Sequence, residues 1–287
     1  SLNGLEKHPG FRITPSLAIK MFYCVFYGDL LLSLKNQVEP YEKNKGETKR
    51  IADEITEELG KAVKRMKLSF KEVEKHCKKI LGRFKQIPVD KTNKVRVGVV
   101  GEIYVKFSAL GNNGLEELLL KEGAEPVVPG LMDFFIYTVY AKITDCKLFG
   151  LNRKMLPVFT FLYKFLLAKQ RRFIGVIKSY EVFDAPTPFD EIVKLVDGYI
   201  DTGVKMGEGW LLTAEMLELK ERGVKNVICA QPFGCLPNHI CGKGMMNPDM
   251  NIVAVDYDAG ASKVNQDNRI KLMLALAQNA ENASDAV

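Results

Sequence analysis

The sequence predicts an α/β fold in which a parallel sheet is flanked by helices, with a helical extension at the N-terminus. After residue 94, four short apolar runs alternate with longer stretches of helical periodicity, and strands that are joined by helices pair in parallel through right-handed crossovers. Before residue 94, the apolar spacing is helical throughout. We therefore expect a helical N-terminal region over residues 1–93 and an α/β domain over residues 94–287.

The N-terminal region is predicted to contain one buried helix and one amphipathic helix. Thr14 and Pro15 are a suitable helix start, because proline is tolerated in the first helical turn. Residues 17–34 are apolar on most faces and should be buried, and a polar loop follows at 39–46. Residues 51–84 carry apolar side chains at spacings of three and four, with a break expected near Ser69. Residues 86–94 form a linker.

A basic stretch lies on this second helix. Residues 61–85 contain ten Lys and Arg against two Glu, whereas the whole chain has a net charge of only +6. The basic face has no aromatic side chains on which nucleic-acid bases could stack. We therefore interpret it as a solvated helical face and predict no nucleic-acid partner.

The α/β part is predicted to have strands at 95–100, 124–128, 227–230 and 252–255. A turn at 101–104 and a loop at 106–114 follow the first strand. Helices are expected at 115–121, 134–172, 189–200, 207–222 and 262–278, the second of them interrupted near 150–152 and Pro157. The apolar residues 155–168 precede a basic run and have the composition of a membrane-surface helix. Buried helices of α/β domains have the same composition, so we predict a buried helix and no membrane contact.

Composition indicates a cytoplasmic protein with a sizeable core. The chain has 287 residues, of which 47% are hydrophobic. Its six cysteines include no C-x-x-C pair, which argues against a disulfide framework and for a reducing compartment. There is no signal peptide and no apolar run near 18 residues, so neither secretion nor membrane spanning is expected, and the abrupt start of the chain is typical of a fragment.

The expected site lies at the carboxyl ends of the strands, where sheets of the Rossmann or flavodoxin type bind their ligands. Three loops rich in small and polar residues follow strands there, at 101–114, 231–239 and 256–262, and a further segment at 207–210 opens a helix nearby. The candidate residues in these segments are Glu102, Glu208, Gln231, Cys235, Asn238 and His239.

Cys235 is the central candidate. It follows a turn and precedes a short segment, 237–241, that could be helical, and a thiol beside a helix N-terminus gains thiolate character. Such a thiolate can ligate a metal or act as a nucleophile; the alternative is a small buried residue in a tight turn. A thiol hydrolase that uses His239 as base would need an orienting partner, which the spacing does not supply.

Four motifs carry a family resemblance: G-E-I-Y-V-K-F at 101–107, M-G-E-G-W-L-L-T-A-E at 206–215, Q-P-F-G-C-L-P-N-H at 231–239 and D-Y-D-x-G-A-S at 256–262. Together they resemble the 2-hydroxyacyl-CoA dehydratase superfamily, above all the C-terminal region of the large proteins named activators of (R)-2-hydroxyglutaryl-CoA dehydratase. The resemblance spans nearly the whole chain.

The resemblance implies a cytoplasmic iron–sulfur protein of anaerobic metabolism, of the lyase type. In that family, ATP hydrolysis in an activator drives an electron into a dehydratase cluster that acts on a 2-hydroxyacyl-CoA. Cys235 falls on a cluster-thiolate position; Gln231 and Asn238 are then cofactor-binding candidates, and Glu102, Glu208 and His239 catalytic candidates. The implied partners are an ATP-dependent activator domain or a dehydratase subunit, with an acyl-CoA as the candidate substrate.

Three departures keep a second hypothesis open. A [4Fe–4S] cluster needs about three or four thiolates, and only Cys235 lies in a family motif. The ATPase module of the activators is absent, and residues 245–248 make a shorter bridge to the last strand than the family implies. The alternative is a non-catalytic module that docks an activator or a partner subunit and binds no cluster.

Overall fold

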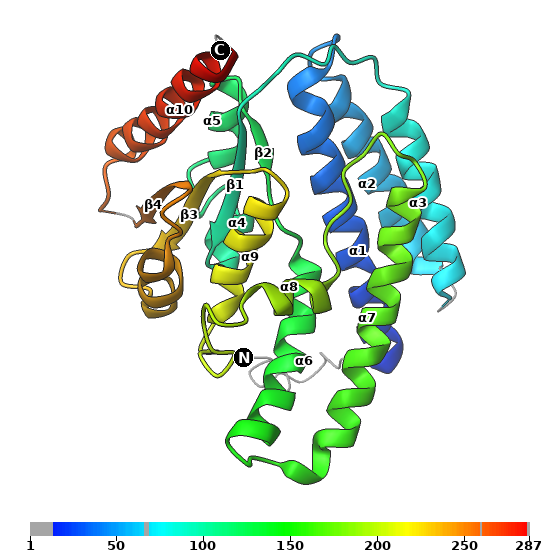
Figure 1. The fold of residues 1–287 in the computed structure, drawn as a ribbon. Coiled ribbons are helices and arrows are strands. Elements are labelled where there is room, and N and C mark those ends of the chain that lie inside the picture. Colours follow the sequence, from blue (N-terminus) through cyan, green and yellow to red (C-terminus); the bar gives the residue numbers. More distant parts are fainter. Residues whose placement is uncertain (1–13, 66–68, 259, 286–287) are drawn as a thin grey trace.

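The computed structural model describes residues 14–65, 69–258 and 260–285, and it confirms the α/β prediction (Figure 1). The sheet contains β1 (Arg96–Gly101), β2 (Glu125–Val127), β3 (Asn226–Pro232) and β4 (Asn251–Tyr257). Their order is β2-β1-β3-β4, and every pair is parallel. Because β2 and β3 lie on opposite sides of β1, the strand order reverses between β1 and β3, and a ligand crevice is expected at the carboxyl ends of these two strands.

Helices cover both faces of the sheet. On one face, α5 (Leu115–Lys121) and α10 (Lys263–Asp285) share a buried cluster with side chains of β1, β3 and β4. On the other face, α9 (Trp210–Glu221) packs on the small or β-branched residues of the same strands. The approach of α9 is close, since a Cβ on Gly98 would lie 2.5 Å from Leu219 Cδ1. Successive side chains of each strand point to opposite faces of the sheet, and helices cover both faces, as is usual for a parallel sheet.

The N-terminal helices form a second layer beside the sheet. They are α1 (Pro15–Val38), α2 (Glu47–Arg65) and α3 (Phe70–Lys85), with a 3₁₀ turn at Glu39–Tyr41. The predicted helix start at Thr14–Pro15 and the predicted break near Ser69 are confirmed. The hydroxyls of Thr14 and Ser69 cap α1 and α3, since they accept hydrogen bonds from Leu17 N and Lys71 N. By length and composition α1 could cross a membrane. However, its Phe26, Leu30 and Leu34 belong to the main core cluster.

The remaining helices join that core. They are α6 (Leu131–Leu148), α7 (Leu156–Lys178) and α8 (Phe189–Leu195), with a 3₁₀ turn at Arg153–Met155. Pro157 lies in the first turn of α7, so it begins this helix rather than interrupting one. A second difference is the short helix α4 (Ile103–Phe107), where the sequence suggested a turn and a loop.

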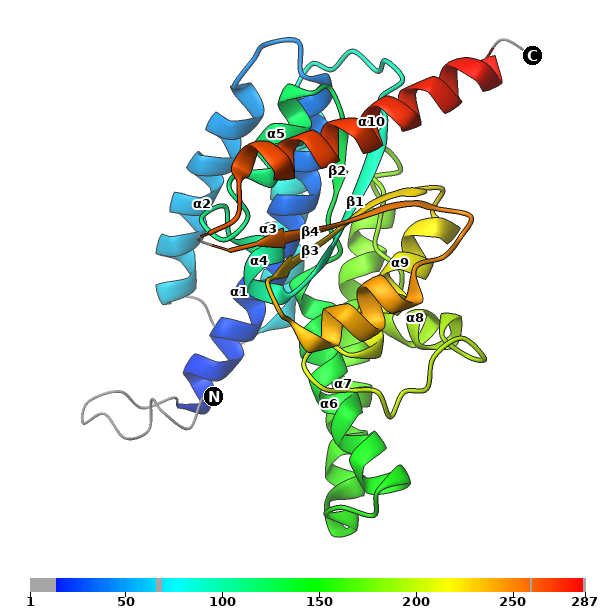
Figure 2. The ribbon, with the colours of Figure 1, turned by 90° about the vertical axis from the view of Figure 1, so that its left-hand side faces the viewer.

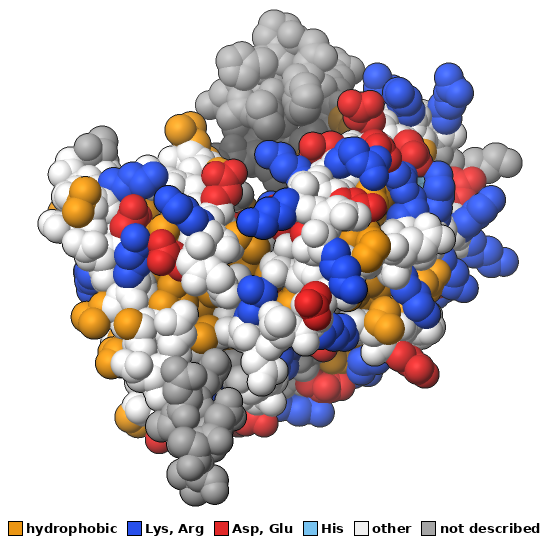
Figure 3. All heavy atoms as spheres, turned by 90° about the horizontal axis from the view of Figure 1, so that it is seen from above, with side chains coloured by type: hydrophobic (Ala, Val, Ile, Leu, Met, Phe, Trp, Pro, Cys, Tyr) orange, Lys and Arg blue, Asp and Glu red, His pale blue; other side chains and the backbone are white. Residues whose placement is uncertain are grey.

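Two bases of α3 are paired with carboxylates of α2. Arg83 contacts Glu54 and Glu58, at 2.6 and 2.9 Å, and Lys79 contacts Glu58 at 2.7 Å. Figure 3, which views the end of the molecule at the amino ends of the strands, shows basic and acidic side chains intermixed. This pairing agrees with the interpretation of a solvated helical face.

The hairpin of α6 and α7 projects from the rest of the molecule (Figures 1 and 2). Its inner half is buried, with Ile136, Phe173 and Ile177 in the main core. Its outer half is exposed: Phe161 has 72% of its surface accessible, Leu148 57% and Leu151 54%. The prediction of a buried helix is therefore wrong for the outer half, where no other described element covers the apolar side chains.

Candidate functional site

The three predicted loops meet at the carboxyl edge of the sheet, and Asp256 joins two of them. Its carboxylate accepts hydrogen bonds from Gln231 Nε2 and from Lys243 Nζ, the latter at 3.1 and 3.2 Å. Its main-chain oxygen accepts from Gln266 Nε2 at 2.8 Å, and Gln266 Oε1 accepts from Asn113 Nδ2 at 2.9 Å. Partial burial raises the pKa of Asp256, but the hydrogen bonds from Gln231 and Lys243 outweigh it and lower the pKa overall.

The loop after β1 is held against β3 by a glycine. Gly101 has φ +145°, and a Cβ there would lie 1.8 Å from Ala230 O. The next residue donates its main-chain N–H to that same oxygen, from Glu102 N to Ala230 O at 3.1 Å. Only glycine allows this approach, so the position of the whole loop depends on it.

Glu102 and Glu208 both bind the N-terminus of α4. Glu102 Oε2 accepts from Val105 N at 2.9 Å, and Glu208 Oε1 accepts from Ile103 N at 3.1 Å. Glu208 is buried, whereas Glu102 is partly exposed. The geometry therefore gives both carboxylates a positioning role, because they satisfy main-chain donors that a helix start leaves unpaired. A catalytic role for either of them stays a prediction.

A buried ion pair lies next to this arrangement, and the sequence reasoning named neither partner. Lys106 Nζ and Glu215 Oε1 are 2.8 Å apart, and their side chains are only 1% and 2% exposed. Burial raises the pKa of Glu215, against the opposing effect of Lys106. The signal was available, since each residue interrupts an apolar run inside a quoted motif.

Cys235 lies in the loop after β3 and is partly exposed, so the alternative of a buried filler in a turn does not hold. Its Sγ accepts a hydrogen bond from Asn238 Nδ2 at 3.3 Å. Asn238 is fully buried, and its Oδ1 accepts from Cys229 Sγ at 3.4 Å. Burial raises the pKa of Cys229 to about 12, so this thiol remains a donor at neutral pH. The donor thiol thus fixes the amide with its N–H side toward Cys235.

The segment that follows Cys235 is helical, as the sequence predicted. It begins at residue 236 and includes a π-turn at Asn238–Gly242. The arrangement that a thiol hydrolase would need, which the spacing did not predict, is not formed. His239 is exposed, its main-chain N–H donates to Cys235 O at 3.1 Å, and its imidazole has no hydrogen-bond partner among the described residues.

Cys235 is the one thiol that the described residues place on this edge with an exposed surface. Cys229 and Cys241 are buried, and burial raises the pKa of Cys241 to about 11. The other cysteines lie on α1, α3 and α6. Within the described ranges, no three His, Cys, Asp or Glu side chains are arranged to hold a metal ion. The described residues therefore present one accessible thiol at this edge and no set of metal ligands.

Exposed apolar side chains surround Cys235. Phe233 is 76% exposed, Leu236 66% and Ile240 50%, and all three lie within five residues of the thiol. Large apolar residues grouped in this way are typical of a surface that another protein covers.

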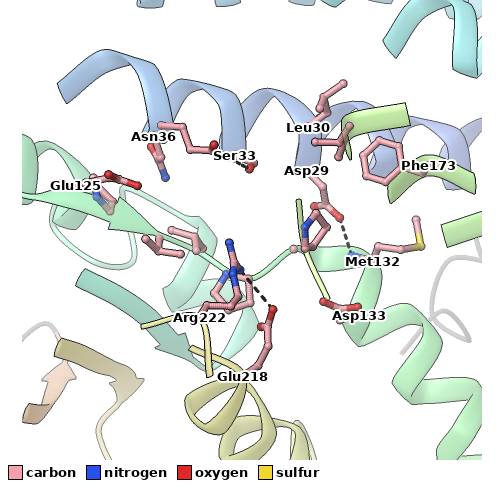
Figure 4. Close-up of a pocket in the computed structure, with 18 of the residues that line it drawn as sticks. Asp29, Leu30, Ser33, Asn36, Glu125, Met132, Asp133, Phe173, Glu218 and Arg222 are labelled. Atoms are coloured by element: carbon pink, nitrogen blue, oxygen red, sulfur yellow. Dashed lines mark hydrogen bonds and ion pairs between the residues drawn. The ribbon is translucent and has the colours of Figure 1, made fainter. Parts of the chain in front are cut away.

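A second candidate is an internal cavity of about 60 Å³ between α1 and β2 (Figure 4). Asn36 lines it with only 2% of its surface exposed, and neither its Nδ2 nor its Oδ1 has a partner in the described part of the chain. The cavity also contains Asp29, Glu218 and Arg222, but Glu218 is already paired with Arg222 at 3.3 Å. A polar cavity of this size suits ordered water that completes the hydrogen bonds of Asn36.

Asp29 makes the stability of the fold depend on pH. Its two carboxylate oxygens accept from Leu131 N and Met132 N, each at 2.8 Å, at the start of α6. Burial nevertheless raises its pKa from 3.8 to about 6. The folded state therefore binds a proton more readily than the unfolded state, and this contribution to stability is lost as the pH rises from 3.8 to about 6.

We predict that the stability of the wild type relative to Asp29→Asn falls by about 2–3 kcal/mol across that range. The measurement is urea unfolding of both proteins at a series of pH values. Glu215, whose pKa is also raised, remains in both proteins and cancels in the difference. Asp133 is coupled to Asp29, whose charge helps to raise its pKa, so its response is part of the measured difference. A difference that is independent of pH would contradict the assignment to Asp29.

Comparisons with protein-family models, with curated proteins and with solved structures gave no match to this chain.

Proposed function

We propose that this chain is part of an iron–sulfur protein of the 2-hydroxyacyl-CoA dehydratase or dehydratase-activator type, in which Cys235 supplies one thiolate to the cluster. The observation that carries the proposal is the hydrogen-bonded sulfur at the carboxyl edge of the sheet. Cys235 is partly exposed and accepts an N–H bond from a buried amide whose orientation a second thiol fixes. Hydrogen bonds to ligating sulfurs are a common means of tuning such clusters.

The remaining ligands come from outside this chain. A cluster needs about three or four ligands, and the described residues offer one accessible thiol at this edge. An activator domain or a dehydratase subunit that covers the edge would bring the others, together with the acyl-CoA. Any lyase activity, or any ATP-driven electron transfer, therefore belongs to the assembled cytoplasmic protein.

The residues of this chain would position the bound group. Asn238 orients the sulfur, and Gln231 and Lys243 hold Asp256 beside it. Glu102 and Glu208 fix the N-terminus of α4, the helix that follows β1 at this edge of the sheet. His239 is exposed and its imidazole has no hydrogen-bond partner in the described part of the chain, so the ring is available to move a proton at the rim.

Anaerobic reconstitution with iron, sulfide and an excess of a small thiol tests this proposal. The small thiol supplies the ligands that the chain lacks, so the wild type is expected to retain protein-bound iron and visible cluster absorbance after gel filtration. Cys235→Ala is expected to lose both. Cys24→Ala is the matched control, because Cys24 is an exposed thiol on α1, away from the carboxyl edge of the sheet.

Equal iron binding by the wild type and Cys235→Ala would refute ligation by this thiol. Iron lost equally from Cys235→Ala and Cys24→Ala would show non-specific binding by exposed thiols. Asn238→Ala extends the test: removal of the N–H donor should shift the cluster absorbance or its reduction potential while Cys235 remains.

The second candidate function is a docking module that binds no cluster. The exposed Phe233, Leu236 and Ile240 around the thiol favour it. If the wild type binds no iron under any of these conditions, this function replaces the first. Phe233→Ser would then weaken capture of a purified dehydratase or activator, whereas Cys235→Ala would not.

A further inference from the structure

The outer half of the α6–α7 hairpin is rich in bases, and its carboxylate Asp145 is paired with Lys142 and Lys205. From residue 146 to residue 180 the chain has eight Lys and Arg and no Asp or Glu. Near the base of the hairpin, Arg171 pairs with Asp190 and Arg172 with Glu74. Four bases near the tip have no carboxylate within ion-pair distance among the described residues. These bases are Lys147, Arg153, Lys154 and Lys164.

Apolar side chains lie at the end of the hairpin among these bases. Leu148 and Leu151 flank the turn, where Gly150 and Asn152 adopt positive φ, and Val158 and Phe161 follow on the first turns of α7. All four apolar residues are more than half exposed. The turn thus places its large apolar side chains outward.

The patch continues along one end of the molecule. An open groove of about 630 Å³ between α1, α3 and α7 is lined by Ile19, Phe22, Leu162 and Phe165. Leu17 and Met21 on α1 are also exposed beside it. Exposed apolar side chains therefore extend along α7 from the tip to the groove beside α1.

We infer that the α6–α7 tip docks on the surface of an anionic lipid bilayer. Three features of the tip fit a bilayer better than a protein partner. It is convex, at the far end of two projecting helices (Figure 2), so a flat surface can reach all its apolar side chains at once. From residue 146 onward the tip carries only bases, and the preceding carboxylate, Asp145, is already paired, which matches a plane of anionic headgroups, whereas protein surfaces carry both signs. Its apolar groups lie outermost with bases around them, the arrangement of an interfacial segment.

This docking does not involve the carboxyl edge of the sheet and does not depend on the iron–sulfur proposal. It also differs from membrane spanning, because the helices of the hairpin return to the core at their inner ends. The bilayer would receive the apolar tip at the depth of the headgroups, and the bases would remain beside the lipid phosphates.

Co-sedimentation of the full chain with vesicles tests the inference. The wild type is expected to bind phosphatidylcholine–phosphatidylserine vesicles, to bind pure phosphatidylcholine at least about tenfold more weakly, and to dissociate as salt is raised. The variant Lys147→Glu/Arg153→Glu/Lys154→Glu should lose at least about tenfold in affinity for the mixed vesicles. Leu151→Ser/Phe161→Ser should lose binding to a similar extent.

The matched control is Lys45→Glu/Lys49→Glu/Lys91→Glu. It makes the same change in net charge at exposed lysines that belong to the segment at the start of α2 and to the linker before β1, and both segments lie at the top of Figure 1, opposite the hairpin tip. If the control loses as much affinity for the mixed vesicles as the tip variant does, the effect comes from net charge alone, and the inference is overturned. Circular dichroism confirms that each variant is folded. Absence of vesicle binding by the folded wild type would overturn it too, as would a tip variant that changes only the oligomeric state.

Discussion

Gly101→Ala is expected to destabilise this protein by more than about 4 kcal/mol, enough to prevent folding of a domain of ordinary stability. The added Cβ would lie 1.8 Å from Ala230 O, 2.7 Å from Ala230 C and 2.9 Å from Ala230 N. All three contacts are with main chain of the central strand β3, so no side-chain rotation can relieve them. The φ of +145° adds backbone strain for any residue with a Cβ.

The matched controls are Gly28→Ala and Gly175→Ala. Both glycines lie in helices, α1 and α7, and a Cβ at either position meets nothing within 4 Å. Each control should be more stable than the wild type by about 0.5–1 kcal/mol, since alanine restricts the unfolded chain and favours helix. Urea unfolding and the yield of soluble protein provide the comparison. A soluble Gly101→Ala protein with the wild-type midpoint would contradict the described contact between β1 and β3.

Lys106→Met is expected to cost about 3–5 kcal/mol, because it leaves Glu215 buried without a counter-charge. Lys106 and Glu215 are 1% and 2% exposed and 2.8 Å apart, and Glu215 Oε2 already lacks a partner among the described residues. In the variant, Glu215 must bind a proton to stay buried, so the loss should be smaller at acidic pH than at neutral pH.

The double variant Lys106→Met/Glu215→Leu separates the charge effect from lost packing. It replaces both members of the pair with apolar groups and should recover more than half of the stability that Lys106→Met loses. Urea unfolding of the wild type, both single variants and the double variant completes a thermodynamic cycle. If the losses of the two single variants simply add, the two side chains do not interact and the ion pair is not formed.

The sequence predicted the secondary structure where local signals are strong. Thr14 and Ser69 begin helices because their hydroxyls can accept main-chain N–H bonds, which is a property of the residue itself. The four strands were recognisable because short β-branched runs between helices are buried on both faces. Helix α4 was not predicted, because its first turn is stabilised by Glu208, which lies 105 residues away from Ile103 in the chain.

The candidate site was predictable to the level of its loops. Parallel strands bring their carboxyl ends to one edge, so the meeting of the segments after β1, β3 and β4 followed from topology. The contacts between individual side chains within the site could not be predicted from topology. The ion pair of Lys106 and Glu215 spans 109 positions, and no spacing rule joins residues so far apart.

By itself, the sequence determined the class of fold, the position of the strand-end loops and the presence of a thiol in one of them. Periodicity, capping residues and strand order are local or topological properties, so they can be read without coordinates. Only the tertiary structure decided what surrounds each side chain. It turned Glu102 and Glu208 toward main-chain donors, oriented Asn238 toward Cys235, and left the outer half of α7 exposed. Burial depends on which distant segments pack together, and an apolar helix has the same composition whether or not a neighbour covers it.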